Sequence, residues 1–174
     1  MKSTANDTFK SSEAANYVVD RLLELGIHRE DISVLMSSHT HEKEFDAIED
    51  SHAPEGIATG AILGGGLGGI VGALTSIGTI AITGGAGLVA AGPLASALLG
   101  LGAGAGTGGL LGGIIGLGFD ETEAKRKEKD ISDGHIVIAA HVDSNLYQTV
   151  QGIFDEAHER EEHNRQRRQA VEFS

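Results

Sequence analysis

The chain contains no cysteine and no tryptophan, and it has only two prolines among its 174 residues. The absence of cysteine excludes disulfides, thiolate metal sites and cysteine nucleophiles, and it is compatible with a reducing cytosol. Two tyrosines and five phenylalanines complete the aromatic set. The aromatic belt that usually marks the interfaces of a membrane protein is therefore missing.

Positive charge is also scarce, because 13 Lys and Arg residues face 25 Asp and Glu residues, for a formal net charge of −12 at pH 7. This balance disfavours nucleic acid as a partner, since basic groups must neutralise its phosphates. It equally disfavours electrostatic adsorption to anionic lipid. Residues 1–10 are polar and lack the apolar core of a secretory signal, so we do not expect export.

Charge is missing altogether from residues 56–119, a run of 64 residues that holds 23 of the 26 glycines. We call this segment the uncharged run. All 38 charged side chains lie in the other 110 residues. The sequence therefore predicts segments of two different structural types in one chain, with the uncharged run inserted between two charged flanks.

Two glycine ladders, each with a step of four residues, lie within the uncharged run. Residues four apart on a helix lie nearly above one another, so each ladder forms a groove into which a second backbone can press. A step of four turns by about 400°, so five rungs drift by roughly 160° and contact more than one neighbour. We therefore predict homo-oligomerisation through these residues: Gly56, Gly60, Gly64, Gly68, Gly72, Gly100, Gly104, Gly108, Gly112 and Gly116.

Glycine also costs a helix in water about 0.8 to 1 kcal/mol relative to alanine, so the run needs a bilayer or a dry protein assembly to be helical. We expect a helical hairpin whose breaks lie at Gly84, Gly85, Gly87 and the Gly92 to Pro93 step. The stretches 57–82 and 88–119 both exceed the ~20 residues that a membrane span needs.

Both ends of the run lead into one domain, so a membrane-spanning hairpin would cross the bilayer twice, with its tip at residues 83–93. The basic cluster at Lys125, Arg126, Lys127 and Lys129 then predicts that both flanks face the cytoplasm at the cytoplasmic membrane. The alternative is a cytoplasmic, soluble shell, ring or filament in which the hairpins fill a dry core.

The flanks show alternating helix and strand patterns. Spacing predicts a capped helix from Ser12 to a left-handed stop at Gly26, a strand at 32–36 and, from less apolar residues, a preceding strand at 7–10. After the run, a charged helix at 120–129 and a covered strand at 136–140 precede a helix that begins near Leu146, capped by Asp143 or Ser144.

This order predicts an α+β fold, a small ferredoxin-like (split βαβ) domain interrupted by the glycine-zipper helical hairpin. The expected divisions are residues 1–55 for the first half of the domain plus an acidic spacer, 56–119 for the hairpin, 120–157 for the second half, and 158–174 for a charged helical tail.

The flanking segments SSEAANYVVDRLLELGIHREDISVLM and GLGFDETEAKRKEKDISDGHIVIAAHVD, with AAGPLASALLG at the centre of the zipper, carry a family resemblance. The chain resembles small bacterial general-stress and low-temperature-induced proteins over roughly residues 9–157. Two features depart from that pattern, a polar first strand in place of a valine-rich run and a long charged tail. The resemblance implies a stress-associated, non-enzymatic role, and it brings no catalytic residues and no cofactor.

Three histidines lie in the acidic spacer and offer weak candidates for a metal site, namely His39, His41 and His52. Mixed imidazole and carboxylate ligands suit zinc, nickel or copper. A solvated acidic loop is the favoured interpretation, because the His-x-His spacing lacks a second fixed pair. The pair His158 and His163 is five residues apart and points about 140° apart on a helix, which favours a charged solvent face.

Other candidates for chemistry are weaker still. His141 beside Asp143 imitates an oriented general base but lies in an apolar strand. The glycine runs lack the GxxxxGK[ST] pattern of a phosphate loop. A small basic cluster in the tail suits an acidic neighbour better than phosphate: Arg165, Arg167 and Arg168. The sequence therefore predicts no enzyme, no cofactor and no small-molecule substrate, and the chain itself as the partner, with a lipid bilayer beside it.

Overall fold

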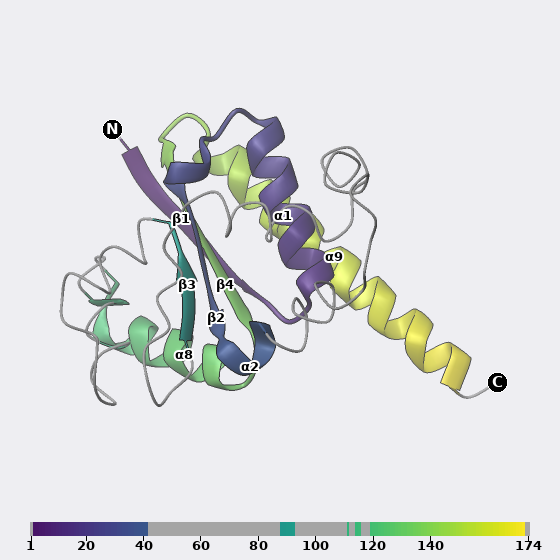
Figure 1. The fold of residues 1–174 in the computed structure, drawn as a ribbon. Coiled ribbons are helices and arrows are strands. Elements are labelled where there is room, and N and C mark those ends of the chain that lie inside the picture. Colours follow the sequence, from purple (N-terminus) through teal and green to yellow (C-terminus); the bar gives the residue numbers. More distant parts are fainter. Residues whose placement is uncertain (1, 42–87, 93–110, 112–113, 116–118, 173–174) are drawn as a thin grey trace, which may run out of the picture.

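The computed structural model describes residues 2–41, 88–92, 111, 114–115 and 119–172 (Figure 1). The elements in chain order are β1 (Lys2–Phe9), α1 (Ser12–Glu24), the 3₁₀ turn η1 (Arg29–Asp31), β2 (Ile32–Ser37), α2 (Ser38–His41), β3 (Leu88–Ala91), α8 (Glu121–Ser132), β4 (Ile136–Asp143) and α9 (Tyr147–Glu172).

The four strands form one antiparallel sheet in the order β1-β4-β2-β3. β1 pairs with β4 from Lys2↔Asp143 to Phe9↔Ile136, and β2 pairs with the other edge of β4. β1 and β2 are joined by α1, and they run in the same direction because both are antiparallel to the strand between them. The predicted α+β class is confirmed.

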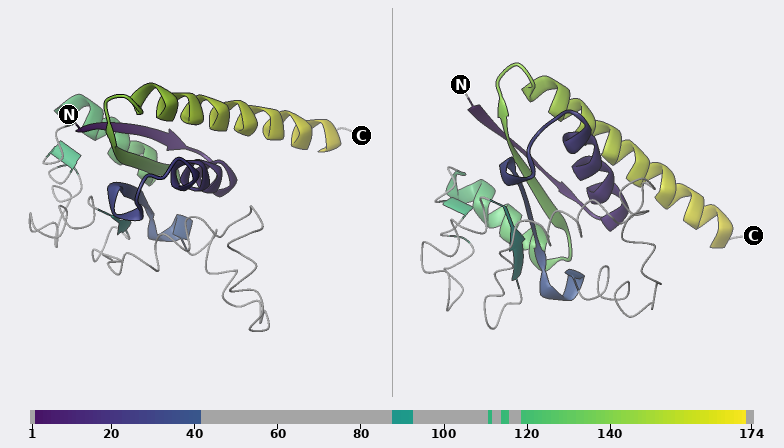
Figure 2. Two further views of the ribbon diagram at one scale, coloured as in Figure 1. Left: turned by 90° about the horizontal axis from the view of Figure 1, so that it is seen from above. Right: turned by 45° about the horizontal axis from the view of Figure 1, so that its top comes forward.

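Helices cover both faces of this sheet. α1 and α9 lie side by side over one face, and α8 lies on the other (Figure 1). The main core forms between the sheet and the α1–α9 layer, where Phe9, Phe154, Leu22, Ile136 and Ile138 are among the fully buried side chains. The last turns of α9 extend beyond α1 and the sheet (Figure 2). The α1–α9 layer therefore carries most of the apolar burial.

The helix ends follow from local residue chemistry. The Ser11 side chain caps α1 by accepting from the backbone N–H of Ala14, one residue before the predicted start. At the other end Gly26 has φ +81, its N–H bonds the carbonyl of Leu23, and the N–H of Ile27 bonds that of Leu22. This paired bonding is the Schellman ending. The left-handed stop predicted at Gly26 is confirmed.

Two boundaries differ from the sequence prediction. β1 covers Lys2–Phe9 rather than 7–10, because Ala5 and Phe9 both turn into the core and small polar residues fill the positions between them. β4 continues to Asp143, whose carbonyl accepts from the Leu146 N–H across the turn at 144–146. Asp143 therefore ends a strand instead of capping a helix, and α9 begins at Tyr147. The charged tail continues α9 to Glu172 without a break.

The largest difference concerns Leu88–Ala91, which was expected at the tip of the helical hairpin and the start of its second arm and is the strand β3. All ten ladder glycines lie outside the described residues, and of the rest of the expected hairpin only residues 92, 111, 114–115 and 119 are described. Among the residues that the structure describes, no helix combines the length and the apolar character needed to cross a membrane.

Candidate functional site

The middle of the uncharged run is part of the sheet. β3 pairs antiparallel with β2 in a register that runs from Val34↔Ala91 to Ser37↔Leu88. Ala90 is completely buried in this position. Along the chain, β3 lies between α2 and α8, so a segment from the middle of the run is part of the sheet.

Gly92 makes the tightest backbone contact of this joint. Its φ is +84, and a Cβ placed on it would lie 2.0 Å from the carbonyl oxygen of Ile32 and 2.9 Å from the Cα of Ser33. Both neighbours are backbone atoms, so no side chain can turn aside to make room. Only glycine fits where the chain passes from β3 across the start of β2.

β2 depends on β3 to complete its surroundings. Val34, Leu35 and Met36 are each 1% exposed or less, and Ser33 is fully buried, so this strand is covered on both faces. One edge of β2 bonds β4 and the other bonds β3. Removing β3 would leave the outer N–H and C=O groups of a buried strand without protein partners, which is energetically costly.

The point at which the chain leaves β2 is also fixed. The hydroxyl groups of Ser37 and Thr40 lie 2.7 Å apart, and the Thr40 N–H donates to Ser37 Oγ at 3.1 Å. Thr40 Oγ1 in turn donates to the carbonyl oxygen of Gly134 at 3.2 Å. These bonds tie the turn after β2 to the turn between α8 and β4.

α8 receives the chain when it returns from the run. The Asp120 side chain caps it by accepting from the Glu123 N–H at 2.8 Å. Lys127 is buried under the sheet and donates to Thr8 Oγ1 of β1 at 2.7 Å. Burial lowers the pKa of the Lys127 ammonium, and nearby carboxylates, Asp7 first among them, offset part of this effect. This contact fastens α8 to the far edge of the sheet from β3.

The densest group of charged contacts fastens α9 to the turn between β1 and α1. Glu161 Oε1 accepts from the backbone N–H groups of Lys10 and Ser11, each at 2.8 Å, and from Ser11 Oγ at 3.0 Å. His158 Nε2 lies 3.1 Å from Asp7 Oδ2, and its ring stacks on Phe9 with centroids 5.0 Å apart. The Ser11 hydroxyl donates to Glu161 and accepts from the Ala14 N–H. These contacts therefore stabilise the position of α9.

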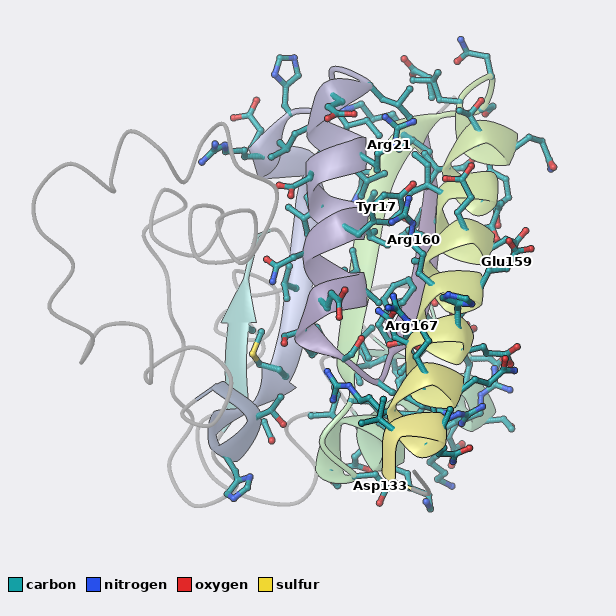
Figure 3. All side chains as sticks on the ribbon, turned by 90° about the vertical axis from the view of Figure 1, so that its right-hand side faces the viewer. Tyr17, Arg21, Asp133, Glu159, Arg160 and Arg167 are labelled. Atoms are coloured by element: carbon teal, nitrogen blue, oxygen red, sulfur yellow. The ribbon has the colours of Figure 1, made fainter. Side chains whose placement is uncertain are left out.

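A second contact joins α9 to α1 one turn away. Tyr17 donates its hydroxyl to Glu156 Oε2 at 2.6 Å, and this bond, with burial, raises the pKa of Tyr17. The Arg160 guanidinium lies 4.1 Å from the centre of the Tyr17 ring. Figure 3 shows Arg160 reaching from α9 to Tyr17, whereas Glu159 points outward. The two helices are thus joined by polar as well as apolar contacts.

Two open grooves flank these contacts, with volumes of about 580 and 530 Å³. The second is lined by side chains of both signs, including Lys10, Arg165 and Arg168 beside Glu13 and Glu162. Two of the three arginines of the basic tail cluster, Arg165 and Arg168, therefore line the same groove as two glutamates.

The histidine candidates do not converge in the described part of the chain. His39 is exposed on α2, His41 belongs to the same short helix, and His52 lies outside the described residues. In the segments described, no group of three His, Asp or Glu side chains is arranged to hold a metal ion.

The remaining histidines are held apart from one another. His141 Nδ1 is buried and has no hydrogen-bond partner among the described residues, so Asp143 does not orient the ring. His158 contacts Asp7, whereas His163 lines the groove beside Tyr17. The two rings therefore lie on different sides of α9, as their spacing predicted.

β3 and Gly92 were missed as site residues by the sequence reasoning. A short apolar segment, Leu88 to Ala91, stands between Gly87 and the Gly92 to Pro93 step, which is a possible strand signal. The surrounding small apolar residues hid it, because a continuous apolar run fits a buried helix equally well.

Comparison with family models, with curated proteins and with solved structures gives no match for this chain. Its function is therefore inferred from its own residues and contacts.

Proposed function

We propose that this chain is a non-enzymatic structural protein that self-associates through its uncharged run, for which the α+β domain is a fixed frame. The stress-associated role implied by the family resemblance is part of the proposal. The observation that carries it is the joint at β3, which places a segment from the middle of the run on the sheet of the domain, beside β2.

Pairing of β3 with β2 fixes a point between the two halves of the run, which reduces the conformational entropy that each half loses on association. The glycine ladders supply side-chain-free surfaces, and charge, which would resist burial, is absent from the whole run. Each half of the run carries one ladder. Together these features favour packing of runs from several copies against one another.

The position of β3 favours protein over lipid as the surroundings of the run. A bilayer-spanning hairpin would place its tip, residues 83–93, across the membrane from both flanks, yet β3 belongs to that tip and pairs with β2. The 26 residues at 93–118 are too few for two crossings of ~20 residues each. A dry assembly of hairpin-like loops is therefore the primary proposal, and attachment to the cytoplasmic membrane is the alternative.

The arrangement of β1, α1 and β2 around β4 supports assignment of the domain to the ferredoxin-like type. In that fold two parallel strands joined by a helix have a third, antiparallel strand between them. β3 adds a strand from the uncharged run beside β2. The proposal is thus a split βαβ domain that is interrupted and also extended by its insert.

Substitutions in the ladders test the self-association. We expect Gly64→Leu and Gly104→Leu to lower the assembled fraction at least tenfold, because a leucine fills the groove that the partner backbone needs. Leu67→Ile and Leu110→Ile keep the volume and serve as matched controls. Equal effects of the two sets, measured by light scattering after size exclusion, would refute the groove.

Alkaline carbonate extraction of cell membranes separates the two alternatives. Release of the whole chain into the supernatant is expected for a protein assembly. Retention in the pellet, with release by detergent, would establish the membrane alternative instead.

A further inference from the structure

β3 is held on the sheet by a short ladder, and long connections join it to the rest of the chain. Four residue pairs join it to β2, whereas 50 residues separate Ser37 from Leu88 and 26 separate Gly92 from Phe119. A segment of 26 residues can span at most about 86 to 94 Å when fully extended. The connections are therefore long enough for β3 to reach a domain other than its own.

β2 offers the same acceptor edge in every copy of the chain. The ladder register and the approach of Gly92 to the Ile32 carbonyl involve only β2, β3 and the residue that follows β3. The residues of β2 that this edge covers are buried. A strand supplied by a second copy makes identical contacts, which is the condition for a domain swap. The exchange therefore leaves the ladder contacts themselves unchanged.

We propose that in the assembled protein β3 of one copy pairs with β2 of a neighbouring copy, in the register seen within one chain. This inference rests on the proposed self-association of the run. Packing of the ladders would bring several domains close together, so that the β2 edge of a neighbouring copy comes within reach of a strand on long connections. The edge of β2 thereby becomes the surface that links one domain to the next.

The absence of cysteine makes the exchange directly measurable. Val34 and Ala91 are register partners, and opposite residues in an antiparallel ladder have Cα atoms about 4.5 to 5.5 Å apart, within the range of a disulfide. Two full-length chains, one carrying Val34→Cys and the other Ala91→Cys, are co-expressed with different tags and then oxidised. We expect a covalent heterodimer as the main oxidised product of the assembled fraction.

The matched control pairs Val34→Cys with Leu88→Cys, because Leu88 lies opposite Ser37 and is three positions out of register. This pair is expected to give at least tenfold less heterodimer. A single chain carrying both Val34→Cys and Ala91→Cys reports pairing within one copy, since its disulfide leaves a monomer on a denaturing gel. The same double variant shows whether the ladder can form the bond at all.

The outcomes separate the two proposals. Assembled protein whose double variant gives only crosslinked monomer, with no heterodimer from the mixed chains, would overturn the strand exchange and leave self-association standing. A monomeric mass for every sample before oxidation would overturn self-association itself. Heterodimer from the mixed chains, with little from the out-of-register control, supports both.

Discussion

The substitution Gly92→Ala addresses the joint between the uncharged run and the sheet. A non-glycine residue in the left-handed region costs about 1 to 2 kcal/mol, and the φ of Gly92 is +84. The added Cβ would also lie 2.0 Å from the Ile32 carbonyl oxygen. Because a contact that short cannot persist, we expect β3 to detach from β2 while the rest of the sheet remains folded.

Detachment removes the hydrogen bonds of a four-pair ladder, each contributing about 1 kcal/mol net. An antiparallel ladder of four pairs holds about four such bonds, and the loss of even about three of them, ~3 kcal/mol, corresponds to roughly a hundredfold change in an equilibrium. Hydrogen exchange followed by mass spectrometry is the assay. We expect amides of β3 and the outer amides of β2 to exchange about a hundredfold faster in the variant, while amides shared by β1 and β4 keep their protection.

Gly26→Ala is the matched control. Gly26 has φ +81 but nothing within 4 Å of the position of an added Cβ, so it isolates the cost of the left-handed backbone. Its effect should be a loss of about 1 to 2 kcal/mol of unfolding free energy, with β3 still protected. If Gly92→Ala also left β3 protected, the close approach to Ile32 would not be what holds the joint.

Three further substitutions test the supporting contacts by urea denaturation. Glu161→Ala should lower the unfolding free energy by about 2 to 3 kcal/mol because it removes the acceptor of three hydrogen bonds, and a similar loss in exposed Glu162→Ala would contradict this. Lys127→Met should abolish a rise of the unfolding free energy with pH. Burial lowers the pKa of Lys127 in the folded chain, so the unfolded chain binds more protons between that pKa and 10.5. Parallel pH profiles of the unfolding free energy in parent and variant would refute this. Gly152→Ala, in open space on α9, should stabilise by about 0.8 to 1 kcal/mol, and a loss of stability would contradict the open site.

The elements of the flanks were accessible to sequence reasoning where a local signal and a burial pattern agreed. Gly26 ended α1 as predicted, and the continuous apolar run at 136–140 marked β4 as a strand covered on both faces. β1 was predicted too short, because Ala5 is the one apolar residue that precedes Phe9 in the strand. Its place in the sheet is set by pairing with β4, which no local pattern reveals.

β3 and the contacts of α9 lay beyond sequence reasoning for a different reason. Leu88–Ala91 becomes a strand because β2 offers a buried edge 50 residues away, and tertiary contacts override local propensity in short apolar segments. Glu161 lies between His158 and His163, whose spacing favoured a charged solvent face, yet it accepts hydrogen bonds from Lys10 and Ser11 near the start of the chain. In both cases, contacts between segments far apart in the sequence determine the local structure.

Self-association through the uncharged run is tested most directly by the mass of the full-length chain in solution without detergent. Light scattering coupled to size exclusion should give a defined multiple of the 18.0 kDa chain, and that multiple should fall when Gly64 and Gly104 are replaced by leucine. A single species of 18.0 kDa over the whole accessible concentration range would contradict the proposal.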